Sequence, residues 1–319
     1  MTGNTKNIIL LLIVDVIIFL VCFFNVGLHS IRSDTEYFVD QIKISRGGMS
    51  LNDLSGATKD LVYFRLFKPV YGALSVFPFG NTSPKNVILI LNLIFFIGLT
   101  ISSYYYFEHV GFDKDFAFLG SVWVSSGYPV LKYGLALVTD ISGWFFAVFS
   151  MAVFLYAIKI NRLSYIAFAS IVGFVGSLSK ETGVLGLMFC GLYLLINNRF
   201  ENKKEVVKKM IALCLPFFLL QGLFLFLMKN IEGPSLFGWV KYNYNIYFYD
   251  FYKIRYFITN EFLSFNLIWI FVFIGMFYLI RERFWGDNKK MSIFIASLFP
   301  AIVVFAWPVF YYRILFIQF

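Results

Sequence analysis

Residues 8–29 read IILLLIVDVIIFLVCFFNVGLH, an apolar run long enough to cross a bilayer as one helix. A helix needs about 20 such residues to span about 30 Å of hydrocarbon. Comparable runs follow along the chain, at roughly 86–107, 116–133, 139–158, 164–179, 183–197, 210–229, 262–280 and 291–308, with a partial run from about 309. The sequence therefore predicts an all-α polytopic membrane protein with about nine or ten transmembrane helices.

The composition agrees with this class of protein. The chain is 60% hydrophobic and 14% charged, and its mean hydropathy is +0.76. A soluble protein could not bury so much apolar surface, so we expect a single transmembrane domain over 1–319. The net charge of +9 does not indicate a nucleic-acid partner, because the positive residues are concentrated in short loops between the apolar runs.

The basic loops predict the orientation. If the runs alternate sides from a cytoplasmic N-terminus, the basic groups fall on the cytoplasmic face, as the positive-inside rule requires. These groups are Lys6; Lys159 and Arg162; Arg199, Lys203, Lys204, Lys208 and Lys209; and Arg281, Arg283, Lys289 and Lys290. We therefore expect a multi-pass protein of the cytoplasmic (cell) membrane, with long outward loops at about 30–85 and 230–261.

The first long loop contains an amphipathic segment at 36–44. Its charged residues repeat at helical spacing, and its apolar residues lie on the opposite face. This pattern predicts a helix that lies flat at the membrane interface. Turn signals at Gly47-Gly48 and Ser83-Pro84 bracket the rest of the loop.

Six ionisable residues lie at the outward ends of the apolar runs. They are Asp34, Lys68, Asp140, Lys180, Glu181 and Arg313. A charge near hydrocarbon costs free energy unless a partner or a function uses it, so their convergence on one side predicts a site. The three cysteines and two histidines form no disulfide framework or metal-ligand pattern, and we expect no cofactor.

Asp34 and Lys68 are the leading candidates, and each also has a simpler structural explanation. Asp34 either caps the interfacial helix or, when partly desolvated, acts as a general base, and the two roles are compatible. Lys68 precedes Pro69 and either reaches lipid headgroups or meets a phosphate.

The other candidates also have structural alternatives. Asp140 opens a helix, where an acidic cap is stabilised by the free N–H groups and the dipole. Lys180 and Glu181 form a turn between two spans, and Arg313 enters the last apolar run and needs an anionic partner. Asp15, inside the first run, is expected only to make a buried polar contact with a neighbouring helix.

The order of these motifs resembles the GT-C glycosyltransferases, polytopic enzymes that use polyprenyl-phosphate sugars. The resemblance is strongest to the branch that holds protein O-mannosyltransferases and the lipid A aminoarabinose transferase. An acidic residue with Glu36-Tyr37 follows the first run, Phe67-Lys68-Pro69 lies later in the same loop, an Asp opens the fourth run, and Ser179 to Gly183 follow the fifth. The similar part covers roughly 8–197, whereas 198–319 agrees only in general character. The sequence stops at Phe319 inside an expected further helix, whereas members of that family commonly continue, so we expect either a fragment or a minimal member.

The resemblance implies that Asp34 is the catalytic base and that Lys68 contacts the donor phosphate. A polyprenyl-phosphate sugar already carries a good leaving group, so the enzyme needs a base for the acceptor and positive charge for the departing phosphate. We hypothesise an inverting transfer to a lipid, glycan or protein acceptor at the extracytoplasmic face. The expected catalytic residues are Asp34 and Asp140, and the expected substrate-binding residues are Glu36, Lys68, Lys180, Glu181 and Arg313.

Other functions fit part of the pattern. If a divalent cation takes part, Asp34 and Asp140 are its candidate ligands, although we favour a metal-free site. The alternative from another class is a lipid or small-solute transporter or flippase, in which the same charges line a translocation path. No internal repeat is visible, which counts against a secondary transporter. A scaffold protein without chemistry is the third option.

Overall fold

The computed structural model describes residues 3–25, 35–55, 59, 62, 66–77, 79–127, 130–137, 139–197, 203–229 and 290–297. These residues form helices and turns, and no strand occurs among them. The longer helices are α1 (Gly3–Asn25), α2 (Thr35–Ser45), α5 (Pro84–Val110), α6 (Lys114–Ser126), α7 (Asp140–Ile160), α8 (Leu163–Ser179), α9 (Leu185–Asn197) and α10 (Lys203–Met228). The shorter elements are η1 (Leu51–Asp53), α4 (Val70–Val76), η2 (Val130–Gly134) and η3 (Glu181–Val184), and residues 290–297 are also helical.

Four of these helices are long and apolar enough to cross a membrane, namely α1, α5, α7 and α10. Helices α8 and α9 are also apolar but shorter. Helix α6 has only 13 residues and so is about 20 Å long, which is less than the thickness of a bilayer. The described part of the chain is therefore all-helical, and its apolar helices indicate a membrane-embedded protein.

The predicted apolar runs agree with six of the helices, α1, α5, α7, α8, α9 and α10. The run predicted at 116–133 is helical in two pieces, α6 and the π-helical turn η2, because the backbone leaves the helix at Gly127. The runs predicted at 262–280 and beyond 297 lie outside the described residues, so the total number of spans stays a prediction.

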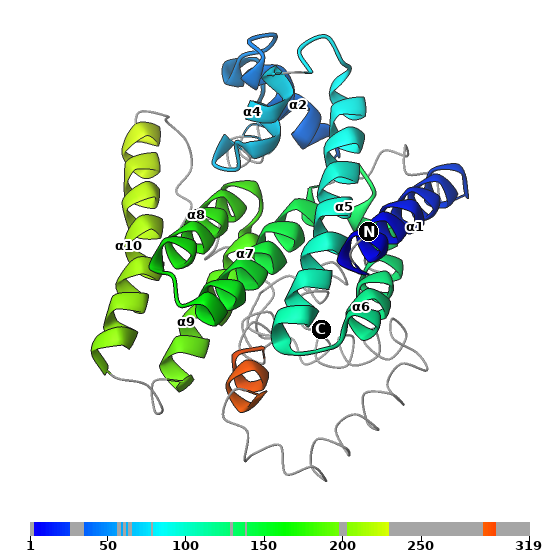
Figure 1. The fold of residues 1–319 in the computed structure, drawn as a ribbon. Coiled ribbons are helices and arrows are strands. Elements are labelled where there is room, and N and C mark those ends of the chain that lie inside the picture. Colours follow the sequence, from blue (N-terminus) through cyan, green and yellow to red (C-terminus); the bar gives the residue numbers. More distant parts are fainter. Residues whose placement is uncertain are drawn as a thin grey trace, which may run out of the picture.

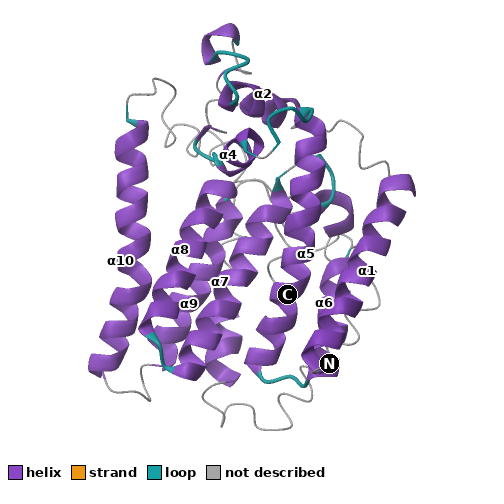
Figure 2. Ribbon diagram, turned by 45° about the horizontal axis from the view of Figure 1, so that its top comes forward, coloured by secondary structure: helices purple, strands orange, loops and turns teal. Residues whose placement is uncertain are grey.

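The long helices stand side by side as a bundle, and α2 and α4 lie at one end of it (Figures 1 and 2). We refer to this as the α2 end of the bundle. Helices α5 and α7 begin at the α2 end, and α8 finishes there (Figure 2). The connections from α5 to α6 and from α7 to α8 lie at the opposite end.

Helix α2 confirms the amphipathic segment predicted at 36–44. Phe38 and Ile42 are buried against the bundle, whereas Glu36 and Lys43 are exposed. The turn predicted after it is also present, with a φ of 73° at Gly47.

Arg46, just after the end of α2, ties this helix to the residues around it. Its guanidinium donates hydrogen bonds to the carbonyl oxygens of Ser75, Phe79 and Thr82, at 3.1, 2.8 and 2.6 Å. Three carbonyls at the end of α4 and before α5 thereby gain a charged donor, and such hydrogen bonds are stronger than neutral ones. Helices α2, α4 and the start of α5 are therefore held together as one unit.

Polar side chains support the non-helical backbone that precedes α7. The amide of Asn92 on α5 donates to the carbonyl of Ala136 at 2.5 Å, and the Tyr71 hydroxyl donates to Asn92 Oδ1 at 2.5 Å. The Thr35 hydroxyl donates to the carbonyl of Leu137 at 3.0 Å. All of these groups are buried, and a buried carbonyl without a partner would cost several kcal/mol in hydrocarbon. The contacts thus fix the point at which α7 begins.

Asp15 lies within α1 and is fully buried. The hydroxyl of Thr100 on α5 donates to its Oδ1 at 3.1 Å. This confirms the expected polar contact with a neighbouring helix.

The turn between α8 and α9 packs closely on the end of α8. A Cβ atom built on Gly183 would overlap the backbone of Gly176, which cannot move aside as a flexible side chain can. We therefore expect Gly183→Ala to lower the stability of the protein by about 3 kcal/mol, as overpacking does elsewhere. Thermal unfolding in detergent measures this effect.

Gly191, in the middle of α9, is the matched control for this substitution. A Cβ atom there meets nothing within 4 Å. Alanine favours a helix over glycine by about 0.5–1 kcal/mol, so Gly191→Ala is expected to raise the melting temperature slightly. Equal melting temperatures for the two variants would contradict the close packing at Gly183.

Candidate functional site

A buried ion pair joins the start of α7 to the end of α8. Lys180 Nζ lies 3.2 Å from Asp140 Oδ1, and the two side chains are only 11% and 3% exposed. Asp140 is the first residue of α7, and Lys180 follows the last residue of α8, where its backbone N–H donates to the Gly176 carbonyl. The Lys180 ammonium also lies 5.9 Å from the centre of the Phe38 ring of α2, a cation–π distance. The pair therefore connects three helices at the α2 end.

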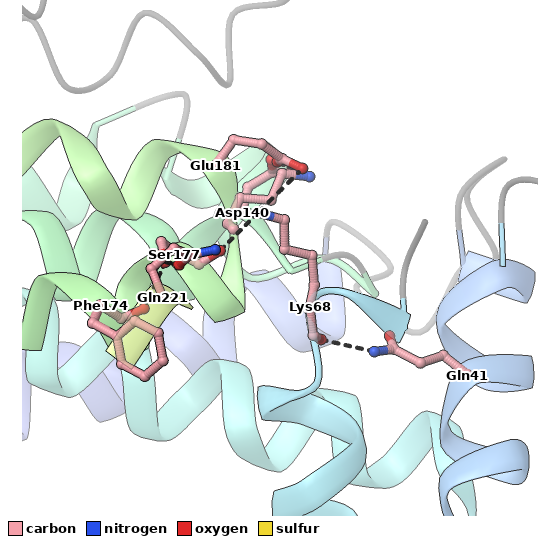
Figure 3. Close-up of polar contacts among 8 residues, drawn as sticks. Gln41, Lys68, Asp140, Phe174, Ser177, Glu181 and Gln221 are labelled. Carbon is pink, nitrogen blue, oxygen red and sulfur yellow. Dashed lines mark hydrogen bonds and ion pairs between the residues drawn. The ribbon is translucent and has the colours of Figure 1, made fainter. Parts of the chain in front are cut away.

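Lys68 enters the same region from the segment before α4. Its Nζ donates to the carbonyl of Ser177 at 2.7 Å and lies 3.7 Å from Glu181 Oε1. The side chain of Gln41 on α2 donates to the Lys68 carbonyl at 2.7 Å, so the backbone of Lys68 is held from one side and its ammonium from the other (Figure 3). Pro69 follows and lies at the N-terminal boundary of α4.

The two ion pairs differ in their exposure to solvent. The Lys68 and Glu181 side chains are 18% and 36% exposed, whereas Asp140 and Lys180 are nearly enclosed. Because an ion pair at 3.7 Å near solvent is weak, an anionic ligand can replace Glu181 beside Lys68 at small cost. Breaking the enclosed pair would take the close counter-charge away from a buried ionic group, which costs free energy. Lys68 is therefore the exchangeable cation, which can leave Glu181 for a ligand, and Lys180 is the fixed cation, which stays paired with Asp140.

Tyr71 and two serines complete the polar surroundings of Asp140. The Ser179 and Ser142 hydroxyls are hydrogen-bonded to each other, and Ser142 also donates to the Thr139 carbonyl at 2.7 Å. Burial raises the pKa of Tyr71 above its usual range, the nearby Asp140 carboxylate raises it further, and a hydrogen bond with Ser142 opposes both effects. Tyr71 therefore remains a neutral hydrogen-bond donor beside the ion pair.

The structure brings together four of the seven predicted site residues, namely Lys68, Asp140, Lys180 and Glu181. Glu36 is exposed on the first turn of α2, and among the described residues no hydrogen bond or ion pair joins it to those four. Asp34 and Arg313 lie outside the described residues, so their predicted roles stay predictions.

Asp140, Lys180 and Glu181 take the structural positions expected for them, and they also make other contacts. Asp140 does begin a helix, as predicted, but Thr139 is the capping residue and makes no side-chain cap, while Asp140 pairs with Lys180. The turn at Lys180 and Glu181 is also present, although Lys180 is buried in it. Within the described ranges, no group of three or more His, Cys, Asp or Glu side chains is arranged to hold a metal ion.

Sequence reasoning did not assign Gln41, Ser177 or Gln221 to the site, although they contact Lys68 or its neighbours. Gln221 carried the clearest signal, because it is an amide within the apolar run 210–229. The carbonyl of Ser177 carried none, since every residue has a carbonyl.

Comparisons of the chain with protein-family models, curated proteins and solved structures found no match. The interpretation of the site therefore rests on its own residues.

Proposed function

We propose that this chain is a membrane glycosyltransferase that moves a sugar from a polyprenyl-phosphate donor to an acceptor at the α2 end of the bundle. The observation that supports this function is the meeting of Lys68, Lys180, Asp140 and Glu181, which come from distant parts of the sequence. A transferase of this kind needs a cation that can bind an anionic lipid and release it again. Lys68 has that character because its ammonium is partly exposed and only loosely paired with Glu181.

In this proposal the acceptor oxygen or nitrogen attacks the anomeric carbon while the bond from that carbon to the phosphate oxygen breaks. The electron pair of that bond leaves with the polyprenyl phosphate, whose negative charge is stabilised by Lys68. Asp34 takes the proton from the acceptor, and the direct displacement inverts the anomeric centre. The enclosed Asp140 is a positioning residue in this proposal. Its carboxylate faces the Lys180 ammonium and holds that ammonium in place.

The proposed topology places the N-terminus in the cytoplasm and the α2 end on the extracytoplasmic side. The end of the bundle opposite the α2 end carries basic residues, which supports this orientation. In the described part they include Lys6, Lys159, Arg162, Lys203, Lys204, Lys208 and Lys209. The donor and the acceptor would then meet outside the cytoplasmic membrane.

The test follows the sugar and the lipid separately. Vesicles containing the full chain are given polyprenyl-phosphate mannose or polyprenyl-phosphate aminoarabinose, each labelled in the sugar, together with a membrane extract as the source of acceptor. We expect the label to leave the lipid phosphate and free polyprenyl phosphate to accumulate. Label that crosses the vesicle membrane while still attached to its lipid would instead indicate a flippase.

Asp34→Asn tests the assignment of the base within that assay. We expect it to slow transfer by about a hundredfold, the lower range of what a general base contributes, with little change in protein yield. Asp40→Asn is the matched control, because among the described residues Asp40 forms an ion pair only with Lys43 of the same helix, at 3.0 Å. Full activity of Asp34→Asn would remove Asp34 from the mechanism.

A further inference from the structure

Helix α10 carries one amide side chain in an otherwise apolar stretch. Gln221 lies among the residues of 210–229 that would face lipid or other helices, where an amide without partners is costly. It is half-buried and points toward α8, while its neighbour Leu223 on the other side of the helix is 55% exposed. An amide at this position therefore requires a structural or a functional explanation.

The structural explanation is a hydrogen bond that holds α8 and α10 together. The contact is weak, because Ser177 Oγ lies 3.4 Å from Gln221 Oε1 and that same hydroxyl already donates to the Phe174 carbonyl at 2.7 Å. The amide nitrogen of Gln221 has no hydrogen-bond partner among the described residues. The contact between the helices thus leaves most of the hydrogen-bonding capacity of Gln221 unused.

Ser177 connects Gln221 to Lys68. Its hydroxyl faces Gln221, and its carbonyl accepts the hydrogen bond from Lys68 Nζ (Figure 3). The residue before Lys68 makes a second connection, since the Phe67 ring packs edge-on against Phe224, with ring centres 6.4 Å apart. Phe224 follows Gln221 by three residues and so lies on the same face of α10. Lys68 and Gln221 therefore flank a single residue of α8.

We propose that Gln221 is a second binding residue for the lipid substrate and selects a phosphodiester monoanion. One non-bridging oxygen of the phosphate would receive the Lys68 ammonium and the other the Gln221 amide N–H. This inference rests on the proposed function in taking Lys68 as the phosphate contact. It deepens that function by naming the charge state that the site prefers.

The charges of the site support a monoanion over a dianion. Among the described residues, Lys68 and Lys180 are balanced by Asp140 and Glu181, so these four side chains supply no net positive charge to offset a second negative charge on the ligand. A neutral amide beside one exchangeable cation suits a phosphodiester, which carries one charge. A phosphate monoester carries close to two charges at neutral pH. The donor is a diester and the lipid product a monoester, so this preference favours release of the product.

The experiment uses sugar-free probes, so that its result does not depend on glycosyl transfer. Methyl farnesyl phosphate serves as the diester and farnesyl phosphate as the monoester, and each is titrated into the purified full chain in nanodiscs. We expect the diester to bind more tightly. Gln221→Met keeps the length of the side chain and removes the amide, and it should weaken binding of the diester about tenfold, the effect of a hydrogen bond to a charged group. Gln221→Lys adds a charge and should reverse the preference toward the monoester.

Ser177→Ala tests whether Gln221 binds the ligand or only joins α10 to α8. It removes the other end of the Ser177–Gln221 contact but keeps the carbonyl that receives Lys68. If Gln221 only joined the helices, Ser177→Ala and Gln221→Met would change the melting temperature and binding alike, and the proposal would be overturned. Failure of the wild-type chain to bind the diester would overturn it as well. Diester binding that depends on Gln221, in a chain that transfers no sugar, would uphold the inference and reject the proposed enzyme.

Discussion

Replacing Lys180 by methionine is expected to destabilise the protein by about 3–5 kcal/mol, a loss large enough to prevent most of it from folding. The substitution leaves the Asp140 carboxylate, only 3% exposed, without the ammonium that faces it at 3.2 Å. It also removes the cation from the Phe38 ring, so a contact between α8 and α2 is lost. Thermal unfolding in detergent and the yield of monodisperse protein measure the effect.

The double variant Asp140→Asn with Lys180→Met distinguishes the cost of an unpaired charge from the value of the pair. Replacing a buried ion pair by neutral groups is often close to neutral in stability, so the double variant should recover most of the lost melting temperature. If Asp140 positions Lys180 for substrate, as proposed, the recovered protein should still transfer sugar poorly. A double variant as unstable as Lys180→Met would show that the pair itself stabilises the fold.

Lys68→Met is expected to lower the rate of transfer by about a thousandfold without a comparable loss of stability. Removing one preorganised group that stabilises transition-state charge typically costs a hundredfold to a thousandfold in rate. The effect on folding should be small, because Gln41 binds the carbonyl of Lys68 and methionine keeps that carbonyl. The rate of polyprenyl phosphate release in vesicles measures the first effect, and thermal unfolding the second.

Two further variants sharpen the assignment of Lys68. Lys68→Arg keeps a positive charge near the Ser177 carbonyl and should retain partial activity. Lys43→Met removes an exposed lysine of α2 whose ion pair with Asp40 lies at the surface, and it should leave activity and stability unchanged. Equal loss of activity in Lys68→Met and Lys43→Met would mean that general surface charge, and not Lys68, is needed.

Most of the helices could be predicted because a long apolar run is a local property of the sequence. The runs at 86–107 and 139–158 correspond to α5 and α7, and Ser83 and Pro84 mark the start of α5 as expected. The break after α6 could not be predicted in the same way. The apolar character of 116–133 continues through Gly127 and hides the break, although Gly127 and Pro129 are residue types at which helices commonly end.

Four of the seven predicted site residues lie together, and their pairings could not be predicted. Charges at the ends of apolar runs are visible in the sequence, and Lys68, Asp140, Lys180 and Glu181 do lie together. Which cation faces which carboxylate depends on how α8 sits against α7, and no local pattern reports that. No local pattern indicates that Lys180 is the enclosed cation and Lys68 the more exposed one.

The hydrogen bonds that support the segment before α7 have a consequence for biosynthesis. Thr35 and Asn92 donate to the carbonyls of Leu137 and Ala136, and both donors precede those acceptors in the chain. Since translation proceeds from the N-terminus, the donors have left the ribosome before the carbonyls that need them are made. The irregular segment can therefore be satisfied as soon as it enters the bilayer, without waiting for any part of the chain that is synthesised later.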